Sequence, residues 1–139
     1  MTDRFTIVFI LGLLFGSTIV FAAPIVDPVS VFAVSFESRQ SSLPPAQLSK
    51  VQEAVEFLKR FPSVHVWVDG HADATEGSDA DCQRLSEVRA RVVYDWLVAQ
   101  GHATQLQGRR GFGKSQPVDS SDAEEHRRYN RRVEIHVAD

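Results

Sequence analysis

Strict alternation of side chains in the middle of the chain is the feature that most restricts its fold. In residues 63–69 (SVHVWVD) valine occupies every second position from Val64 to Val68, and polar or aromatic residues fill the positions between. Because successive side chains of a strand point to opposite faces, this pattern predicts a strand with one apolar face, ended by Gly70. Such a face has to be covered by a second layer, and the flanking segments supply helices for it.

The segment before this strand predicts an amphipathic helix over residues 45–61. Its apolar residues follow at spacings of three, four and three, which places them on one narrow face: Leu48, Val51, Val55 and Leu58. Pro45 fits the first helical turn, where its missing N–H is no loss, and Pro62 ends the helix.

The segment after the strand predicts a polar loop and then a longer helix over residues 82–99. Asp79 or Asp81 is suited to cap the start of this helix, and Gly101 closes it. The residues expected to face the core are Leu85, Val88, Val92, Val93, Trp96 and Leu97.

Three further strands and a short helix complete the predicted order. The strands are expected near residues 31–36, 104–110 and 133–137, and the short helix within residues 122–130. The order β-α-β-α-β-(α)-β predicts an α/β (α+β) two-layer sandwich, in which helices cover one face of a mixed sheet. A chain of 139 residues is long enough for one such domain, which we expect over residues 31–139.

A phosphate-loop pattern, G-x-x-x-x-G-K-[ST], occurs in residues 108–115 (GRRGFGKS), with Lys114 and Ser115 in the required places. In a working phosphate loop a buried strand precedes the glycines, and a helix begins near the lysine. Here residues 103–107 hold one large apolar residue, and Pro117 falls about one turn inside the required helix, at a cost of about 3 kcal/mol. We therefore interpret the segment as a strand-to-turn connection.

The N-terminal part of the chain contains an apolar run, residues 5–23, without a charged side chain. It predicts a signal peptide over residues 1–22, cleaved after Ala22, which would export the protein to the periplasm. The alternative is an uncleaved membrane anchor, since about 19 apolar residues can span a bilayer. Residues 23–30 are then a linker, and no cysteine directly follows the run to carry a lipid.

The charge distribution gives no reason to expect nucleic acid as a partner. The formal net charge is −3, and the basic stretch of residues 126–132 has acidic neighbours on both sides: Asp119, Asp122, Glu124, Glu125 and Glu134. The single cysteine, Cys82, cannot form an internal disulfide.

The loop after residue 70 holds the residues that catalytic or metal chemistry would need. His71 and Asp73 could ligate a metal, with a further ligand from the acidic loop or His102, but their spacing is not that of a specific metal site. Asp73 and Glu76 could form a carboxylate pair for acid–base work. Because an acidic loop is more often a solvated helix cap, we expect no metal, no cofactor and no catalytic residue.

Four motifs in order resemble the OmpA C-terminal-like family, which includes the periplasmic domains of OmpA, Pal and MotB. They are GHAD at residues 70–73, LSEVRA at 85–90, GFGKSQP at 111–117 and NRRVE at 130–134. The resemblance extends over about residues 31–137, nearly all of the chain beyond the apolar run.

The resemblance implies a domain that binds peptidoglycan noncovalently through the diaminopimelate of its stem peptide, and not an enzyme. By motif position, Asp73 would take the ammonium group of the ligand and Arg89 its carboxylate. Thr75, Cys82 and Arg131 would line the same pocket. The implied location is the periplasm, in association with the cell wall or outer membrane. The alternative is that the fold serves as an interaction module for an envelope protein.

The helical register independently singles out Arg89. It lies four residues after Leu85 and three before Val92, on the apolar face of the predicted helix, so its charge requires a partner. A ligand is one such partner. The other is Asp73, in an internal salt bridge that binds nothing.

The sequence departs from the family pattern at three places. The loop between Asp73 and Arg89 is one residue longer than the usual spacing, with Glu76 as the inserted residue. Cys82 stands where the family usually has an asparagine that helps to hold the ligand. The first strand carries VSFE at residues 34–37 in place of F-[DN]-F-[DN].

Overall fold

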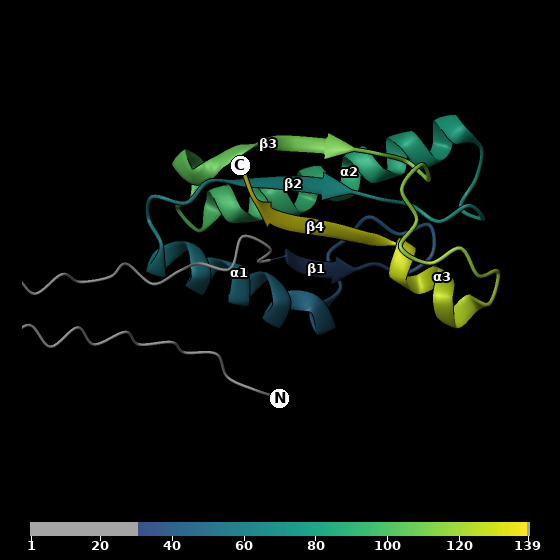
Figure 1. The fold of residues 1–139 in the computed structure, drawn as a ribbon, viewed down its shortest axis with the longest axis horizontal. Helices are drawn as coiled ribbons and strands as arrows, with labels where there is room; N and C mark the ends of the chain where they lie inside the picture. The colour runs from purple at the N-terminus through teal and green to yellow at the C-terminus, as the bar shows by residue number, and fades with distance from the viewer. Residues whose placement is uncertain (1–30, 139) are drawn as a thin grey trace, which may run out of the picture.

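Four strands form one mixed sheet in the computed structural model, which describes residues 31–138 (Figure 1). They are β1 (Val31–Ser35), β2 (Val66–Gly70), β3 (Leu106–Gly111) and β4 (Arg132–Val137). The strand order is β1-β4-β2-β3, with β2 and β3 parallel and the other two pairs antiparallel. The predicted signal peptide of residues 1–22 and the linker of residues 23–30 lie outside the described residues.

Helices α1 (Leu48–Arg60) and α2 (Asp79–Ala99) pack on one face of the sheet, and a single core lies between the layers. The largest fully buried apolar side chains of this core are Val34, Val51, Val55, Leu58, Val66, Val68, Val93, Leu97, Val133 and Ile135. A third helix, α3 (Glu124–Asn130), lies at the end of the sheet where β4 begins (Figure 1). The predicted two-layer sandwich is therefore confirmed.

Two short 3₁₀ turns precede regular elements: η1 (Pro45–Gln47) leads into α1, and η2 (Ala103–Gln105) leads into β3. Pro45 occupies the first turn, as predicted. Four apolar residues are expected on the core face of this helix, and the prediction is wrong for Leu48, which lies at the exposed start of α1. Ala54, which is not among the four, is buried in the core.

The alternating segment forms β2, although the strand begins at Val66 and so later than predicted. Val66 and Val68 are buried in the core, and Trp67 and Asp69 lie on the opposite, helix-free face of the sheet. Asp69 is nevertheless buried, because Arg110 of the neighbouring strand donates two hydrogen bonds of 2.7 Å to its carboxylate.

The core-facing side of α2 is rotated from the predicted one. Four expected core residues, Leu85, Val88, Val92 and Trp96, are half-buried at the flanks of the helix. The buried positions are Cys82, Ser86, Arg89, Ala90, Val93 and Leu97. Ser78 caps the helix, with Asp81 completing a capping box, so the expectation of an aspartate as the N-cap is also wrong.

The rotation has a steric cause, which is the close approach of α2 to the sheet. A Cβ added at Gly70 would lie 2.0 Å from the carbonyl oxygen of Ser86 and 3.1 Å from the Cβ of Ala90. Only small residues fit on both sides of such a contact, so the helix places Ser86 and Ala90 against Gly70, and Leu85 and Val88 lie at its flanks.

Candidate functional site

The predicted site residues lie at one end of the sheet, where β2 passes into the loop that leads to α2. The chain continues beyond β2 in register with its neighbours, since the His71 N–H donates to the carbonyl of Arg132 and the Ala72 N–H to that of Gly113, each at 2.8 Å. These bonds hold the start of the loop in place. Asp73 follows directly, so its position is set by the backbone of the sheet.

Asp73 is buried, and its carboxylate is bonded within the protein. Oδ1 accepts from the N–H and the hydroxyl of Thr75, at 2.7 and 2.6 Å, and Oδ2 accepts from Nη1 of Arg131 at 3.1 Å. Burial alone would raise the pKa of Asp73, but hydrogen bonds from Thr75 and Arg131 outweigh it and hold the pKa below its ordinary value. The group is therefore a carboxylate at neutral pH and unsuited to act as a general acid.

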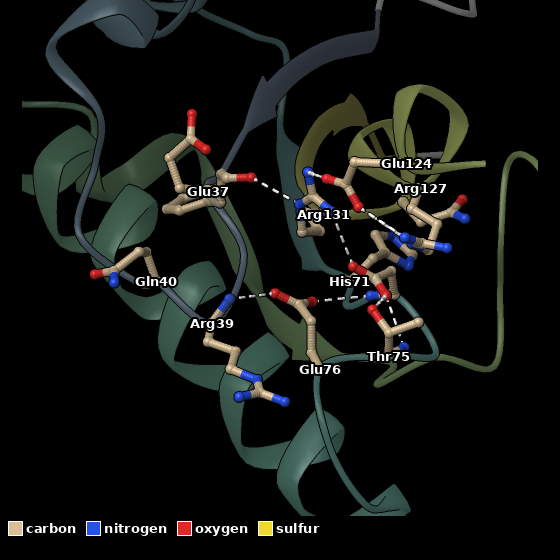
Figure 2. A network of polar contacts seen from close by, with 12 residues as sticks. Glu37, Arg39, Gln40, His71, Thr75, Glu76, Glu124, Arg127 and Arg131 are labelled. Carbon is tan, nitrogen blue, oxygen red and sulfur yellow. Dashed lines mark hydrogen bonds and ion pairs between the residues drawn. The ribbon is translucent and has the colours of Figure 1, made fainter. Parts of the chain in front are cut away.

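Arg131 connects this loop to two other segments. Besides its bond to Asp73, its Nη2 donates to Oε1 of Glu124 at 2.8 Å and its Nε to the carbonyl of Phe36 at 3.3 Å. Figure 2 shows Arg131 beside Glu124 of α3. The guanidinium thus joins α3 and the end of the first strand to the loop.

Arg89 reaches the same loop from α2, and it is fully buried. Its partner is Glu76, with Nη2 to Oε1 at 2.6 Å and Nη1 to Oε2 at 2.9 Å. Three backbone carbonyls take its remaining N–H groups: Gln40 at 2.8 Å from Nε, His71 at 3.1 Å from Nη1 and Glu37 at 3.1 Å from Nη2. The expectation that a charge at this position requires a partner is confirmed. The alternative of a salt bridge between Arg89 and Asp73 is wrong, because Asp73 pairs with Arg131.

Glu76 is the residue of the site whose role was missed from the sequence. The sequence pattern predicts a loop insertion or one half of a carboxylate pair at this position, yet the side chain is fully buried against Arg89. Its two oxygens also accept the backbone N–H groups of Arg39, at 2.8 Å, and Asp73, at 2.9 Å. Figure 2 shows Glu76 reaching toward the segment that carries Arg39. One feature of the sequence points to this role. The extra residue in the loop is a carboxylate, and the arginine on the core face of the next helix requires a partner of opposite charge.

Thr75 and Cys82 occupy opposite sides of the loop. Thr75 is exposed, while Cys82 is buried, with its Sγ 3.5 Å from the carbonyl oxygen of Asp73 and 3.6 Å from that of Gly77. Burial raises the pKa of the Cys82 thiol, which keeps it protonated and unreactive. Cys82 thus braces the loop from the helix side, and Thr75 faces solvent above Asp73.

The arrangement consists of two adjacent ion pairs, Asp73 with Arg131 and Glu76 with Arg89, connected through the backbone N–H of Asp73. Across residues 31–138, no three His, Cys, Asp or Glu side chains gather in a way that could hold a metal ion. Chemically, the arrangement offers carboxylates and guanidinium groups, which recognise ammonium and carboxylate groups of a ligand by charge-assisted hydrogen bonds.

His71 borders the site on the helix-free face of the sheet. It is buried, its ring stacks on Phe112 with centroids 5.5 Å apart, and both ring nitrogens are without a hydrogen-bond partner. The nearest carboxylate, that of Glu134, is 3.8 Å away. Burial, reinforced by the charge of Arg132, lowers the pKa of His71 to about 4.

The phosphate-loop segment has none of the required surroundings. The strand before it, β3, is an edge strand, and the chain after Gly111 forms turns and not a helix. Lys114 pairs with Asp79 at 2.7 Å, and the Ser115 hydroxyl donates to the carbonyl of Phe112 at 2.6 Å. The interpretation as a strand-to-turn connection is confirmed.

The basic stretch of residues 126–132 is neutralised by its neighbours, as predicted. Its contacts with acidic side chains include His126 with Asp119 at 2.5 Å, Arg127 and Arg131 with Glu124 at 3.0 and 2.8 Å, and Arg132 with Glu134 at 2.6 Å. Among the helices of the described part of the chain, none has the length and apolar character to cross a membrane.

Comparisons with protein-family models and with known protein sequences identify relatives of this chain. The model of the OmpA family matches residues 35–131. Outer membrane porin F of Pseudomonas aeruginosa is 36% identical over 108 residues, which cover 75% of this chain and 30% of that protein. Peptidoglycan-binding protein ArfA of Mycobacterium tuberculosis is 35% identical over 112 residues, 81% of this chain and 34% of ArfA. The chain thus spans about a third of the length of these relatives.

Among solved structures, the peptidoglycan-associated lipoprotein from Burkholderia pseudomallei has the same fold. It superposes with a TM-score of 0.69 at 24% identity, covering 76% of this chain and 89% of that one.

Proposed function

This chain belongs to the OmpA family, and from that premise we propose that its domain binds peptidoglycan noncovalently and so attaches to or senses the cell wall. The observation that carries the proposal is the family match over residues 35–131, joined by a relative of 35% identity named as peptidoglycan-binding. The five predicted site residues all lie within the matched span: Asp73, Thr75, Cys82, Arg89 and Arg131.

The ligand group that we propose is the diaminopimelate of the stem peptide, whose free end carries an ammonium and a carboxylate. Asp73 would accept hydrogen bonds from the ammonium, and Arg89 would donate a bidentate pair to the carboxylate. The low pKa of Asp73 favours this role, because an ionised carboxylate attracts an ammonium. Thr75, which is exposed beside it, marks the side from which a ligand would enter.

We propose that the protein works in the periplasm, in association with the cell wall or outer membrane, as a binding protein and not as an enzyme. Residues 1–22 would serve as the export signal, or as an anchor if they are retained. The intact mass of the exported protein tests this part, because a mass that still includes Met1 would mean an anchor.

Sedimentation with purified peptidoglycan sacculi tests the binding. We expect the wild-type domain to sediment with diaminopimelate-type sacculi and Asp73→Asn to bind at least about tenfold more weakly, since a charge-assisted contact contributes about 1.5–3 kcal/mol. Asp95→Asn, the same change at an exposed position of α2, is the matched control and should bind like wild type. Thermal melts would verify that each variant is folded. Failure of the wild type to sediment would refute the proposal.

Arg89 is a poor first choice for this test, although it is part of the proposed site. All of its N–H groups are bonded within the protein, so Arg89→Ala would leave Glu76 as an unpaired buried carboxylate. Loss of one partner of such a pair costs about 3–5 kcal/mol. A loss of binding by this variant would then reflect unfolding of the domain and not the loss of a contact with the ligand.

The internal hydrogen bonding of Asp73 and Arg89 also favours a second candidate function. In this function the domain keeps the fold, does not bind peptidoglycan and serves as an interaction module for another envelope protein. Asp73 and Arg89 are both buried and internally paired, as expected of structural groups. A domain that melts cooperatively, ignores sacculi and binds an envelope protein would support this function over the first.

A further inference from the structure

The contact between Glu76 and Arg89 has the geometry that a bound carboxylate would adopt. The two carboxylate oxygens face the two terminal nitrogens of the guanidinium at 2.6 and 2.9 Å, which is the bidentate fork of Arg–carboxylate recognition. A guanidinium has five N–H donors, and the other three are used by backbone carbonyls. Arg89 therefore has no donor left for a ligand while Glu76 is in place.

Glu76 is itself fully engaged, with two bonds to each carboxylate oxygen. Oε1 accepts from Arg89 and the N–H of Arg39, and Oε2 accepts from Arg89 and the N–H of Asp73. Both side chains of the ion pair have no exposed surface. Removing either charge alone would strand the other, but exchanging one carboxylate for another keeps every guanidinium bond.

The loop that carries Glu76 is placed so that such an exchange is possible. Its neighbours in residues 74–78 are all exposed, and Glu76 alone in that segment turns inward. Gly77, which follows it, has φ of +146°, in the range that favours glycine. Since the side chains of Ala74, Thr75 and Ser78 do not belong to the core, an outward movement of this segment would leave the packing between helices and sheet in place.

We propose that Glu76 is a built-in occupant of the carboxylate position on Arg89, and that a ligand binds there only by displacing it. This inference rests on the proposed function and adds a mechanism that regulates ligand binding. The folded site is closed by its own carboxylate, and the ligand's carboxylate has to compete with one that is covalently attached and always present. Glu76 thereby sets the affinity of the site and keeps it closed in the absence of ligand.

The first experiment compares wild type, Glu76→Gln and Glu125→Gln on two kinds of sacculi. Diaminopimelate-type stem peptides carry the second carboxylate, and lysine-type peptides lack it. Glu125, whose side chain is 77% exposed, is the matched control. We expect Glu76→Gln to bind diaminopimelate-type sacculi at least about tenfold more tightly than wild type, because the amide cannot replace the ionic fork, with no gain on lysine-type sacculi.

The outcomes separate the two proposals. If wild type binds and a Glu76→Gln variant that melts cooperatively binds no better, the inference is overturned and the proposed function stands. If neither binds, both are overturned. If only the variant binds, the inference is supported, and the wild-type site is closed too firmly for the proposed function.

The second experiment needs no peptidoglycan and uses acetate as the probe. Glu76→Ala leaves a space beside Arg89 that acetate can enter, so sodium acetate at pH 7 should raise the melting temperature of the variant by several degrees above sodium chloride of equal ionic strength. Wild type should show no such difference. A variant that gains nothing from acetate, folded or unfolded, overturns the inference, since Arg89 would then not accept an external carboxylate.

Discussion

Acid should destabilise this domain through His71 at a higher pH than through the paired carboxylates of Asp69 and Asp73. The ring is buried with both nitrogens unbonded, and burial together with Arg132 lowers its pKa from 6.5 to about 4. Other groups around it act in both directions, since Glu134 and Asp69 favour the protonated ring and His136 opposes it. The unfolded chain binds a proton near pH 6.5, whereas the folded chain resists it until about pH 4.

The sign and size of the effect follow from this difference. Between pH 6.5 and 4 the unfolded state holds more protons, so stability falls as the pH falls through this window. Each unit of pKa corresponds to 1.36 kcal/mol, which makes the His71 contribution about 3 kcal/mol by pH 4. The carboxylates of Asp69 and Asp73, with pKa values below their ordinary 3.8, should add their losses at still lower pH.

Urea unfolding at a series of pH values from 7 to 4 measures the effect. His71→Phe keeps the aromatic contact with Phe112 and removes the ionisable group, so its unfolding free energy should fall by about 3 kcal/mol less than that of wild type over this range. His65→Phe, the same change at an exposed position, should leave the wild-type slope unaltered. Parallel curves for wild type and His71→Phe, or a native His71 pKa near 6.5 by NMR, would refute the reasoning.

Three further predictions concern packing, capping and the phosphate-loop pattern. Gly70→Ala places a methyl group 2.0 Å from the Ser86 carbonyl oxygen and should cost about 3 kcal/mol or prevent folding, as measured by the urea midpoint. Ser78→Ala removes the N-cap of α2 and should cost about 1 kcal/mol in the same assay, and an unchanged midpoint would argue against the cap. Lys114→Ala loses only an exposed contact with Asp79 and should leave the melting temperature within error, whereas saturable Mg²⁺-dependent ATP binding by wild type would contradict our interpretation of the segment.

Local pattern was sufficient for the elements and their layers. The valine alternation of β2, the proline at the start of the first helix and the apolar spacing in α1 each concern a few neighbouring residues. The structure has the predicted strand and helix in these segments, although β2 begins later than predicted and Leu48 is exposed. The edge position of β3 also follows from its sequence, which lacks the apolar residues of a central strand. These features depend on local backbone geometry and on burial, and the spacing of apolar residues along the sequence reflects both.

The face of α2 was not predictable in the same way. Its larger apolar residues suggested a stripe through Leu85 and Trp96, but the helix buries Ser86 and Ala90 against Gly70 instead. How closely a helix approaches a sheet is decided by the residues on both sides of the contact. The spacing of apolar residues within the helix describes only the helix side of the contact and gives no information about the sheet side.

The sequence by itself determined that Arg89 would be a charge on the core-facing side of a helix and that acidic residues would lie in the loop before it. Only the tertiary structure decided that Glu76, and not Asp73, reaches Arg89, while Asp73 pairs with Arg131 from 58 residues further along the chain. The two carboxylates are three residues apart and chemically equivalent, and hydrogen bonds to them require a fit of a few tenths of an ångström. That fit depends on the path of one loop and on carbonyl groups supplied by the segment after β1, which come together only when the sheet has formed.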